Sequence, residues 1–114
     1  MLRGEIRIVD FEPARSGKAA KRRPAVIVSN DGANTAAARL GHGVVTVVPV
    51  TSNVDRVHRF QVLLDDECGL ERESKAQAEQ IRSVSIERVS SRVGVVPPAL
   101  MRRVDEALRL HLAL

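Results

Sequence analysis

Residues 43–52 read Gly-Val-Val-Thr-Val-Val-Pro-Val-Thr-Ser, a continuous apolar run that ends in two hydroxyl side chains. A run of this kind, preceded by glycine and followed by a polar turn, is typical of a strand buried on both faces. Pro49 has no backbone N–H, so regular strand pairing should break near it. We therefore expect a buried strand with Thr51 and Ser52 at its terminus or in a bulge.

Working outward from this strand, the apolar pattern predicts a chain of short strands with one helix at its end. Gly4–Asp10 alternates apolar and charged residues, and Pro24 suits the first position of a strand. In Lys75–Val84 the apolar residues change parity, which predicts a bulge near Glu79–Gln80. The predicted strands are 4–10, 25–29, 43–50, 60–64, 75–84 and 89–95. A short helix or turn is predicted at 34–40, with Asn30 and Asp31 as N-caps, and a helix at 97–114.

The closing helix carries an apolar stripe at spacings of three and four residues, formed by Met101, Val104, Leu108 and Leu112. Such a stripe predicts packing of the helix against the strands. Short strands, tight turns and a packed C-terminal helix together predict a mainly β, antiparallel barrel. At 114 residues we expect one domain, 1–114.

The amino-acid composition argues against several classes of function. The chain has no Trp or Tyr and only two Phe residues, which argues against a nucleic-acid binder built on stacked aromatic rings. Cys68 is the only cysteine, as expected for a protein of the reducing cytoplasm, and the acids around it argue against a reactive thiolate. No apolar run reaches membrane-spanning length, so we expect no membrane association.

Positive charge is concentrated in Arg15–Arg23, which holds five basic residues and no acid. The net charge of the whole chain is +4, so the remainder of the chain is slightly acidic. A concentrated field of this sign attracts a polyanion, and phosphate is the obvious target. The alternative is a solvated loop without a ligand.

The residues offer little for metal or cofactor chemistry, and none is expected. His42, His58 and His111 have no metal-ligand spacing, and the chain has neither a phosphate-binding glycine motif nor a nucleophile elbow. Metal-free RNA cleavage needs neither, because the substrate's 2′-hydroxyl is the nucleophile. The protein has to align that hydroxyl, stabilise charge on the phosphate and manage two protons.

Arg23 suits the phosphate role, because its guanidinium fork matches two phosphate oxygens and Pro24 restricts its backbone. Thr51 or Ser52 could donate a hydrogen bond to the same oxygens. By pattern alone, the alternative is an exposed arginine at the start of a strand and a turn at the end of another.

Four segments, taken together in order and spacing, resemble the MazF/PemK family of toxin endoribonucleases. The segments are Gly4–Ile6 with Val9–Pro13, Arg23–Ser29, Val48–Ser52 and Ala78–Val84, and the helix at 97–114 falls where the family has one. The resemblance implies an SH3-like (CcdB/MazF-type) antiparallel barrel and a homodimer. It also implies a toxin of a type II toxin–antitoxin system, inhibited by a cognate MazE-like antitoxin.

In chemistry, the resemblance implies metal-independent, sequence-specific cleavage of single-stranded RNA that leaves a 2′,3′-cyclic phosphate and a 5′-hydroxyl. Arg23 and Thr51 match the family's catalytic arginine and threonine. We expect the RNA to be bound by the basic segment, by the turn after Thr51 and by the acidic-Gln-Ile-Arg strand. The expected RNA-binding residues are Arg15, Lys18, Lys21, Arg22, Ser52, Asn53, Glu79 and Gln80.

The chain departs from the family at two places. Arg7 replaces the usual aromatic residue, and Lys18 replaces the usual acid of the basic loop. Two alternatives stay open, the first because the fold alone does not exclude it and the second because the change to Lys18 could disable cleavage. One is a CcdB-like poison that binds an enzyme such as DNA gyrase through the end of the C-terminal helix, near Leu110 and Leu114. The other is a homologue that binds RNA without cleaving it.

Overall fold

The computed structural model describes residues 1–12 and 21–114. Its strands form one sheet of seven, in the order β4-β5-β3-β2-β1-β7, with β6 paired to β3. The bounds are β1 Glu5–Glu12, β2 Lys21–Ile27, β3 Val44–Thr51, β4 Gln61–Leu64, β5 Ser74–Gln77, β6 Arg82–Ser85 and β7 Val89–Val95, with helices α1 Asp31–Leu40 and α2 Pro98–Leu112 and 3₁₀ turns η1 Asp66–Cys68, η2 Ala78–Gln80 and η3 Ile86–Arg88.

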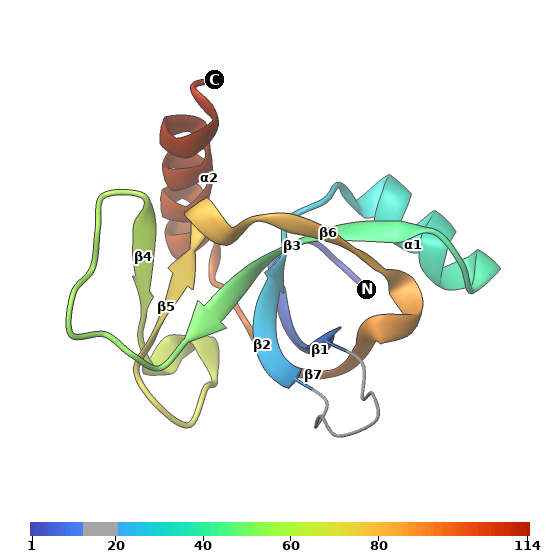
Figure 1. Cartoon of the computed structure of the whole chain (residues 1–114), viewed down its shortest axis with the longest axis horizontal. Coiled ribbons are helices and arrows are strands. Elements are labelled where there is room, and N and C mark those ends of the chain that lie inside the picture. The colour runs from blue at the N-terminus through green and yellow to red at the C-terminus, as the bar shows by residue number, and fades with distance from the viewer. Residues whose placement is uncertain (13–20) are drawn as a thin grey trace.

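The run at 43–52 forms β3, the strand that joins the two halves of the sheet (Figure 1). One edge of β3 pairs with β2, with Ala25 opposite Pro49. The other edge pairs first with β6, through residues 44–47, and then with β5, through Val50 and Thr51. Because β3 changes partner along one edge, the sheet curls around it, as the predicted barrel requires.

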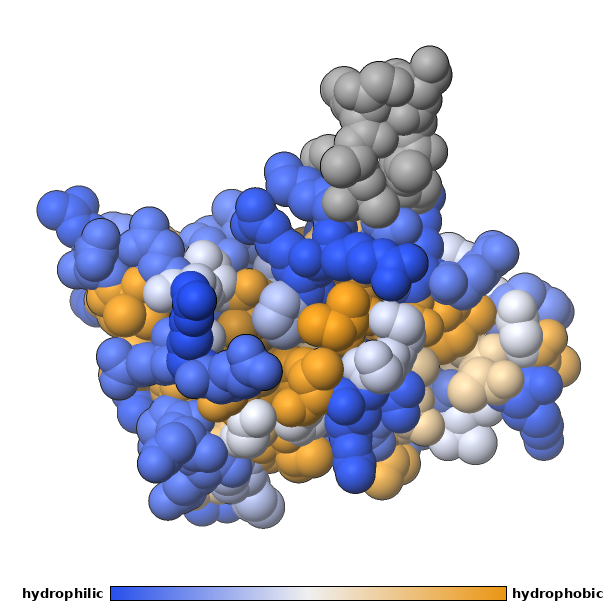
Figure 2. All heavy atoms as spheres, turned by 90° about the horizontal axis from the view of Figure 1, so that it is seen from below, coloured by the Kyte–Doolittle hydropathy of each residue, from blue (hydrophilic) through white to orange (hydrophobic). Residues whose placement is uncertain are grey.

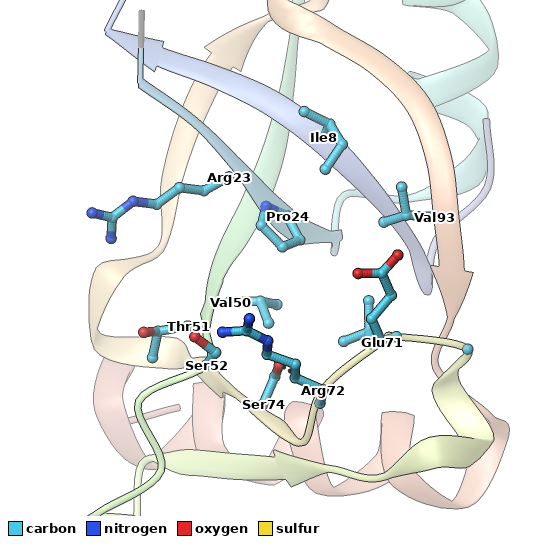
Figure 3. A pocket seen from close by; sticks show the side chains of 12 residues that line it. Ile8, Arg23, Pro24, Val50, Thr51, Ser52, Glu71, Arg72, Ser74 and Val93 are labelled. Atoms are coloured by element: carbon cyan, nitrogen blue, oxygen red, sulfur yellow. Dashed lines mark hydrogen bonds between the residues drawn. The ribbon is translucent and has the colours of Figure 1, made fainter.

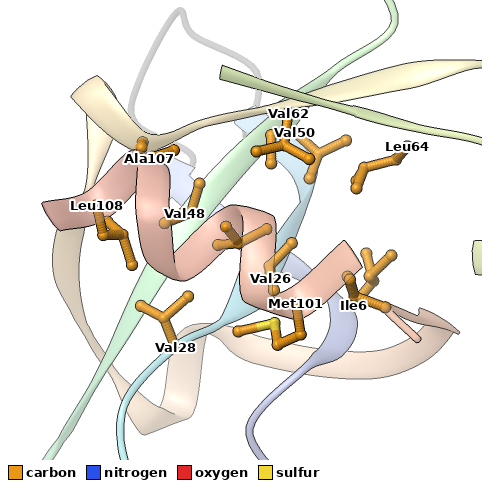
Figure 4. Packing of buried hydrophobic residues seen from close by; sticks show 14 of the residues in the cluster. Ile6, Val26, Val28, Val48, Val50, Val62, Leu64, Met101, Ala107 and Leu108 are labelled. Atoms are coloured by element: carbon orange, nitrogen blue, oxygen red, sulfur yellow. The ribbon is translucent and has the colours of Figure 1, made fainter. Parts of the chain in front are cut away.

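The sheet separates two hydrophobic clusters, so β3 is buried on both faces as predicted, and the second half of β2 is buried in the same way. Val48 and Val50 of β3 belong to the larger cluster, which lies between the sheet and α2 (Figure 4). Val45 and Val47 have the opposite parity and belong to the smaller cluster, beside α1. Successive strand residues point to opposite faces, so one apolar run supplies both clusters.

Several sequence-based expectations about the fold are wrong in detail. The strand predicted at 75–84 is two strands, β5 and β6, separated by η2. The parity change arises because Ile81 N–H donates to the Ala78 carbonyl at 3.2 Å in one 3₁₀ turn, so no bulge is needed. The predicted apolar stripe also ends early: Leu112 is 46% exposed, and Ala107 is buried in its place.

Leu112 is exposed because the C-terminal end of α2 extends past the strands β4 and β5 of the sheet (Figure 1).

The second strand starts earlier than predicted, at Lys21, because β1 continues far enough to pair with it. Arg23 lies opposite Val9 and Arg22 opposite Asp10. The helix α1 begins at Asp31, before the predicted 34–40, and Asn30 caps it by accepting a hydrogen bond from Ala33 N–H at 2.8 Å.

Candidate active site

A cavity of about 790 Å³ opens where β2 begins and β3 ends. Its apolar part is formed mainly by β1, β2, β3 and β7, and its polar part by the residues after β3 and before β5 (Figure 3). The lining residues are Ile8, Arg23, Pro24, Val50, Thr51, Ser52, Gly69, Leu70, Glu71, Arg72, Ser74 and Val93. Figure 2 shows a face of the molecule with the same character, apolar in the middle and bordered by hydrophilic residues.

Arg23 and Thr51 line this cavity from neighbouring strands. In the antiparallel pairing of β2 with β3, Ala25 lies opposite Pro49, and each candidate residue lies two positions beyond that pair. Residues two positions apart on a strand share a face, so the register brings Arg23 and Thr51 to the same side of the sheet. In Figure 3 both lie on the side of the cavity that also carries Ser52.

The Thr51 hydroxyl is oriented by its own turn. Asn53 N–H donates to Thr51 Oγ1 at 3.2 Å, which occupies one acceptor position of the oxygen. A hydroxyl has one donor hydrogen and two acceptor positions, and among the described residues nothing accepts the Thr51 O–H, so it can donate to a ligand. Ser52 lines the cavity beside it.

A smaller cavity of about 300 Å³ shares Arg23 with the first. It also contains Lys21 and Gln80, two of the expected RNA-binding residues, together with Arg82. The Arg82 guanidinium lies 5.0 Å from the centre of the Phe11 ring, so this aromatic face is covered by a cation. Arg23 therefore stands between two adjoining cavities, each with at least one further basic residue.

The structure does not bring every expected residue to these cavities. Arg22 lines a separate cavity of about 400 Å³ with Asp10 and Arg88. The Asn53 side chain accepts from Asp55 N–H at 3.3 Å and serves the turn. Arg15 and Lys18 lie outside the described residues.

Glu79 is held away from both cavities. Its Oε2 accepts a hydrogen bond from Gln61 Nε2 at 2.7 Å. Its Oε1 is buried and has no hydrogen-bond partner within the residues that the structure describes. In this conformation the carboxylate supports η2 and β4, so contact with RNA would require it to leave Gln61.

Sequence reasoning missed Arg72, Glu71 and Ser74, which the fold brings to the cavity. The acid-rich stretch from Asp65 to Glu73 is typical of a solvated loop, and nothing in its pattern points toward Thr51. A basic residue between acids, Arg72, was the only available signal.

Arg7 has a structural partner. Its Nε donates to Glu5 Oε1 at 2.9 Å and its Nη1 to the Ser90 carbonyl at 3.0 Å. Burial alone would raise the pKa of Glu5, but the hydrogen bond and charge of Arg7, with the Leu2 N–H, bring it below the ordinary value of 4.5. Arg7 therefore neutralises a buried acid on β1.

The structure agrees with the expectation for Cys68. Cys68 is 1% exposed, and burial, followed by the charges of Asp65 and Glu67, raises the pKa of its thiol, as expected for an unreactive cysteine. Within residues 1–12 and 21–114, no three His, Cys, Asp or Glu side chains gather as metal ligands. In the same part of the chain, no helix is long and apolar enough to cross a membrane.

The curled antiparallel sheet closed by a C-terminal helix is the fold of solved MazF structures. The family model for PemK-like, MazF-like toxins of type II toxin–antitoxin systems matches residues 2–112. The chain therefore belongs to the PemK/MazF toxin family.

Relatives agree along the whole chain. This chain is 56% identical over 115 residues to endoribonuclease MazF9 of Mycobacterium tuberculosis, and the match covers 100% of this chain and 98% of that protein. It is 28% identical over 114 residues to endoribonuclease EndoA of Bacillus subtilis, covering 98% and 94%.

Solved structures agree as well. A mycobacterial endoribonuclease in complex with its cognate antitoxin superposes with a TM-score of 0.79 at 25% identity, covering 100% of this chain and 96% of the other. MazF of Deinococcus radiodurans gives 0.78 at 23% identity, covering 100% and 97%, which shows the fold alone. The resemblance, the mainly antiparallel barrel with its C-terminal helix, and the assignment to toxin–antitoxin endoribonucleases are confirmed.

Proposed function

We propose that this toxin cleaves single-stranded RNA at specific sequences without a metal, using Arg23 and Thr51. The observation that carries the proposal is that a guanidinium and a free hydroxyl donor line one cavity from adjacent strands. A cavity of about 790 Å³ that is open to solvent leaves room for an unpaired strand, and in this proposal one of its phosphates contacts both groups.

In the proposed reaction, the substrate's 2′-oxygen forms a bond to the adjacent phosphorus, and the bond from phosphorus to the 5′-oxygen breaks. The 2′-hydroxyl loses a proton and the leaving oxygen gains one, so the products carry a 2′,3′-cyclic phosphate and a 5′-hydroxyl. Arg23 binds the phosphate oxygens as their charge increases, and Thr51 donates a hydrogen bond to them. Arginine stays protonated at ordinary pH, so its role here is charge stabilisation.

The remaining expectations form part of the same proposal. Residues 1–114 would act as one toxin domain in the cytoplasm, as a homodimer, with a cognate MazE-like antitoxin as inhibitor. The antitoxin complex among the similar structures supports the last point. Lys21, Ser52 and Gln80 line the two adjoining cavities and are the best placed of the expected RNA-binding residues.

The experiment is end mapping of single-stranded RNA incubated with the purified protein in EDTA. We expect cuts at one short sequence, cyclic phosphate and 5′-hydroxyl ends, and no cut where the sugar before the scissile bond is 2′-deoxy. Cleavage of the deoxy substrate would exclude the 2′-hydroxyl as nucleophile. Salt-sensitive RNA binding without any cut would instead support the RNA-binding alternative.

A gyrase-directed poison has weaker support. Leu110 and Leu114 are 46% and 85% exposed at the end of α2, as that alternative requires. The named relatives along the full chain are endoribonucleases, however, and the cleft is elsewhere on the fold. Growth arrest of expressing cells with intact RNA would favour the poison over the nuclease.

A further inference from the structure

Arg72 belongs to a wall of the cavity that is anchored at several points. At Gly94 of β7, an added Cβ would lie 2.2 Å from the Cys68 carbonyl oxygen, so β7 and the end of η1 are in close contact. Leu70 packs against the larger hydrophobic cluster, and Ser74 Oγ donates to the Arg72 carbonyl at 3.0 Å. The backbone that carries Arg72 is therefore fixed by packing on one side and by a hydrogen bond on the other.

The side chain of Arg72 is exposed and enters the cavity from the wall opposite β2. In Figure 3 its guanidinium points toward Ser52, while the neighbouring Glu71 points toward Val93. Among the described residues the guanidinium has no hydrogen bond or ion pair, in contrast to Arg3 and Arg7, which pair with acids. The positive charge of Arg72 is thus available to a ligand in the cleft.

Arg23 and Arg72 together place a guanidinium on each side of the Thr51–Ser52 hydroxyls. A single phosphate held by Arg23 and Thr51 leaves Arg72 without an anion, whereas an RNA strand carries a phosphate at every step. A guanidinium binds phosphate with two parallel hydrogen bonds, which fixes direction as well as position.

We propose that Arg72 binds the phosphate next to the scissile one and so sets the path of the RNA strand through the cleft. This inference rests on the proposed function, because it takes the Arg23–Thr51 phosphate as the scissile one. Arg72 is a positioning residue that contributes equally to the bound substrate and to the transition state. Its loss should therefore raise KM and leave kcat nearly unchanged.

The test measures binding of single-stranded RNA that carries a 2′-deoxy sugar at the mapped cut site, over a range of salt concentrations. For Arg72→Gln we expect affinity to fall about 10-fold, the effect of one lost charged hydrogen bond. The slope of log affinity against log salt should become shallower by about 0.7, the value for one phosphate on a single strand. With the corresponding cleavable RNA at saturating concentration, the single-turnover rate of Arg72→Gln should differ from the wild-type rate by less than about threefold.

Two variants control the measurement. Arg72→Lys keeps the charge without the fork, so it should keep the wild-type salt slope and lose part of the affinity. Arg102→Gln removes an exposed arginine of α2 that lines none of the three cavities, so both quantities should stay at the wild-type values.

Three results would overturn the proposal. An unchanged affinity and slope in Arg72→Gln would remove Arg72 from the RNA path. Weaker binding with an unchanged slope would indicate contact with a base. A lost cleavage rate at saturating RNA with intact binding would make Arg72 catalytic. If the wild type cuts no RNA, the proposed function fails, but binding of a mixed-sequence RNA still tests for the Arg72 phosphate contact.

Discussion

Thr51 lies directly opposite Lys75 in the pairing of β3 with β5. Lys75 is only 8% exposed, an unusual position for lysine, and its ammonium donates to the Arg56 carbonyl in the connection between β3 and β4. Lys75, which lies opposite the candidate catalytic threonine, therefore restrains the loop that follows Thr51. A buried ammonium needs such a partner, because an unpaired buried charge is costly.

The first prediction concerns this tether. Lys75→Met keeps the volume and the apolar stem but removes the donor to Arg56. We expect the free energy of unfolding to change by less than about 1.5 kcal/mol, because the lost hydrogen bond is offset by a lost buried charge. Hydrogen exchange in the segment 53–59 should become faster, while exchange in β1 stays the same. Unchanged exchange in 53–59 would show that Lys75 does not restrain the loop.

The second prediction concerns Arg23. Arg23→Ala should lower the cleavage rate at saturating RNA on the order of 10²–10³-fold, by analogy with the loss of one preorganised charge-stabilising donor. Arg22→Ala is the matched control, because Arg22 is the adjacent arginine on β2 but lines a different cavity. Its rate at saturating RNA should stay near that of the wild type. Equal rates for the two variants would exclude Arg23 from the chemical step.

The third prediction separates the two hydroxyls at the end of β3. Thr51→Val is nearly isosteric but cannot donate, so we expect a rate loss of about 10²-fold. Thr51→Ser should retain most of the rate, because its hydroxyl can accept from Asn53 N–H in the same way. Ser52→Ala should cost less than about tenfold. A larger loss for Ser52→Ala than for Thr51→Val would transfer the proposed role to Ser52.

Sequence patterns predicted the strands near the site well, because β2 and β3 carry apolar side chains for a cluster on each face. The facing positions of Arg23 and Thr51 follow from the β2–β3 register, which the residues alone did not specify and only the family resemblance suggested. Arg72 could not be predicted, since its place depends on the contact of Gly94 with Cys68, distant in sequence. Exposure of Leu112 likewise depends on where the sheet ends beneath α2.

The fourth prediction concerns the pH dependence of stability. The pKa of Glu5 is lower in the folded state than its ordinary value of 4.5, so Glu5 stabilises the fold above that pH. This contribution is lost as the pH falls from about 4.5 through the lowered folded pKa. We expect Glu5→Gln to reduce the difference in unfolding free energy between about pH 6 and about pH 3. Glu106→Gln, at an exposed site on α2, should leave that difference unchanged, and urea unfolding measures both.

The fifth prediction concerns the contact that positions the Arg72 wall. A Cβ at Gly94 would lie 2.2 Å from the Cys68 carbonyl oxygen, so β7 and η1 must move apart in Gly94→Ala. Since a backbone atom is the obstacle, we expect destabilisation of about 1–3 kcal/mol in urea unfolding, the usual cost of overpacking.

Ser91→Ala, at an exposed site of the same strand, should change the unfolding free energy by less than about 0.5 kcal/mol. Because η1 leads directly into the segment that carries Arg72, Gly94→Ala should also weaken binding of the 2′-deoxy RNA in conditions where the variant is folded. A Gly94→Ala protein as stable as the wild type, with unchanged RNA affinity, would mean that the wall is not held by this contact.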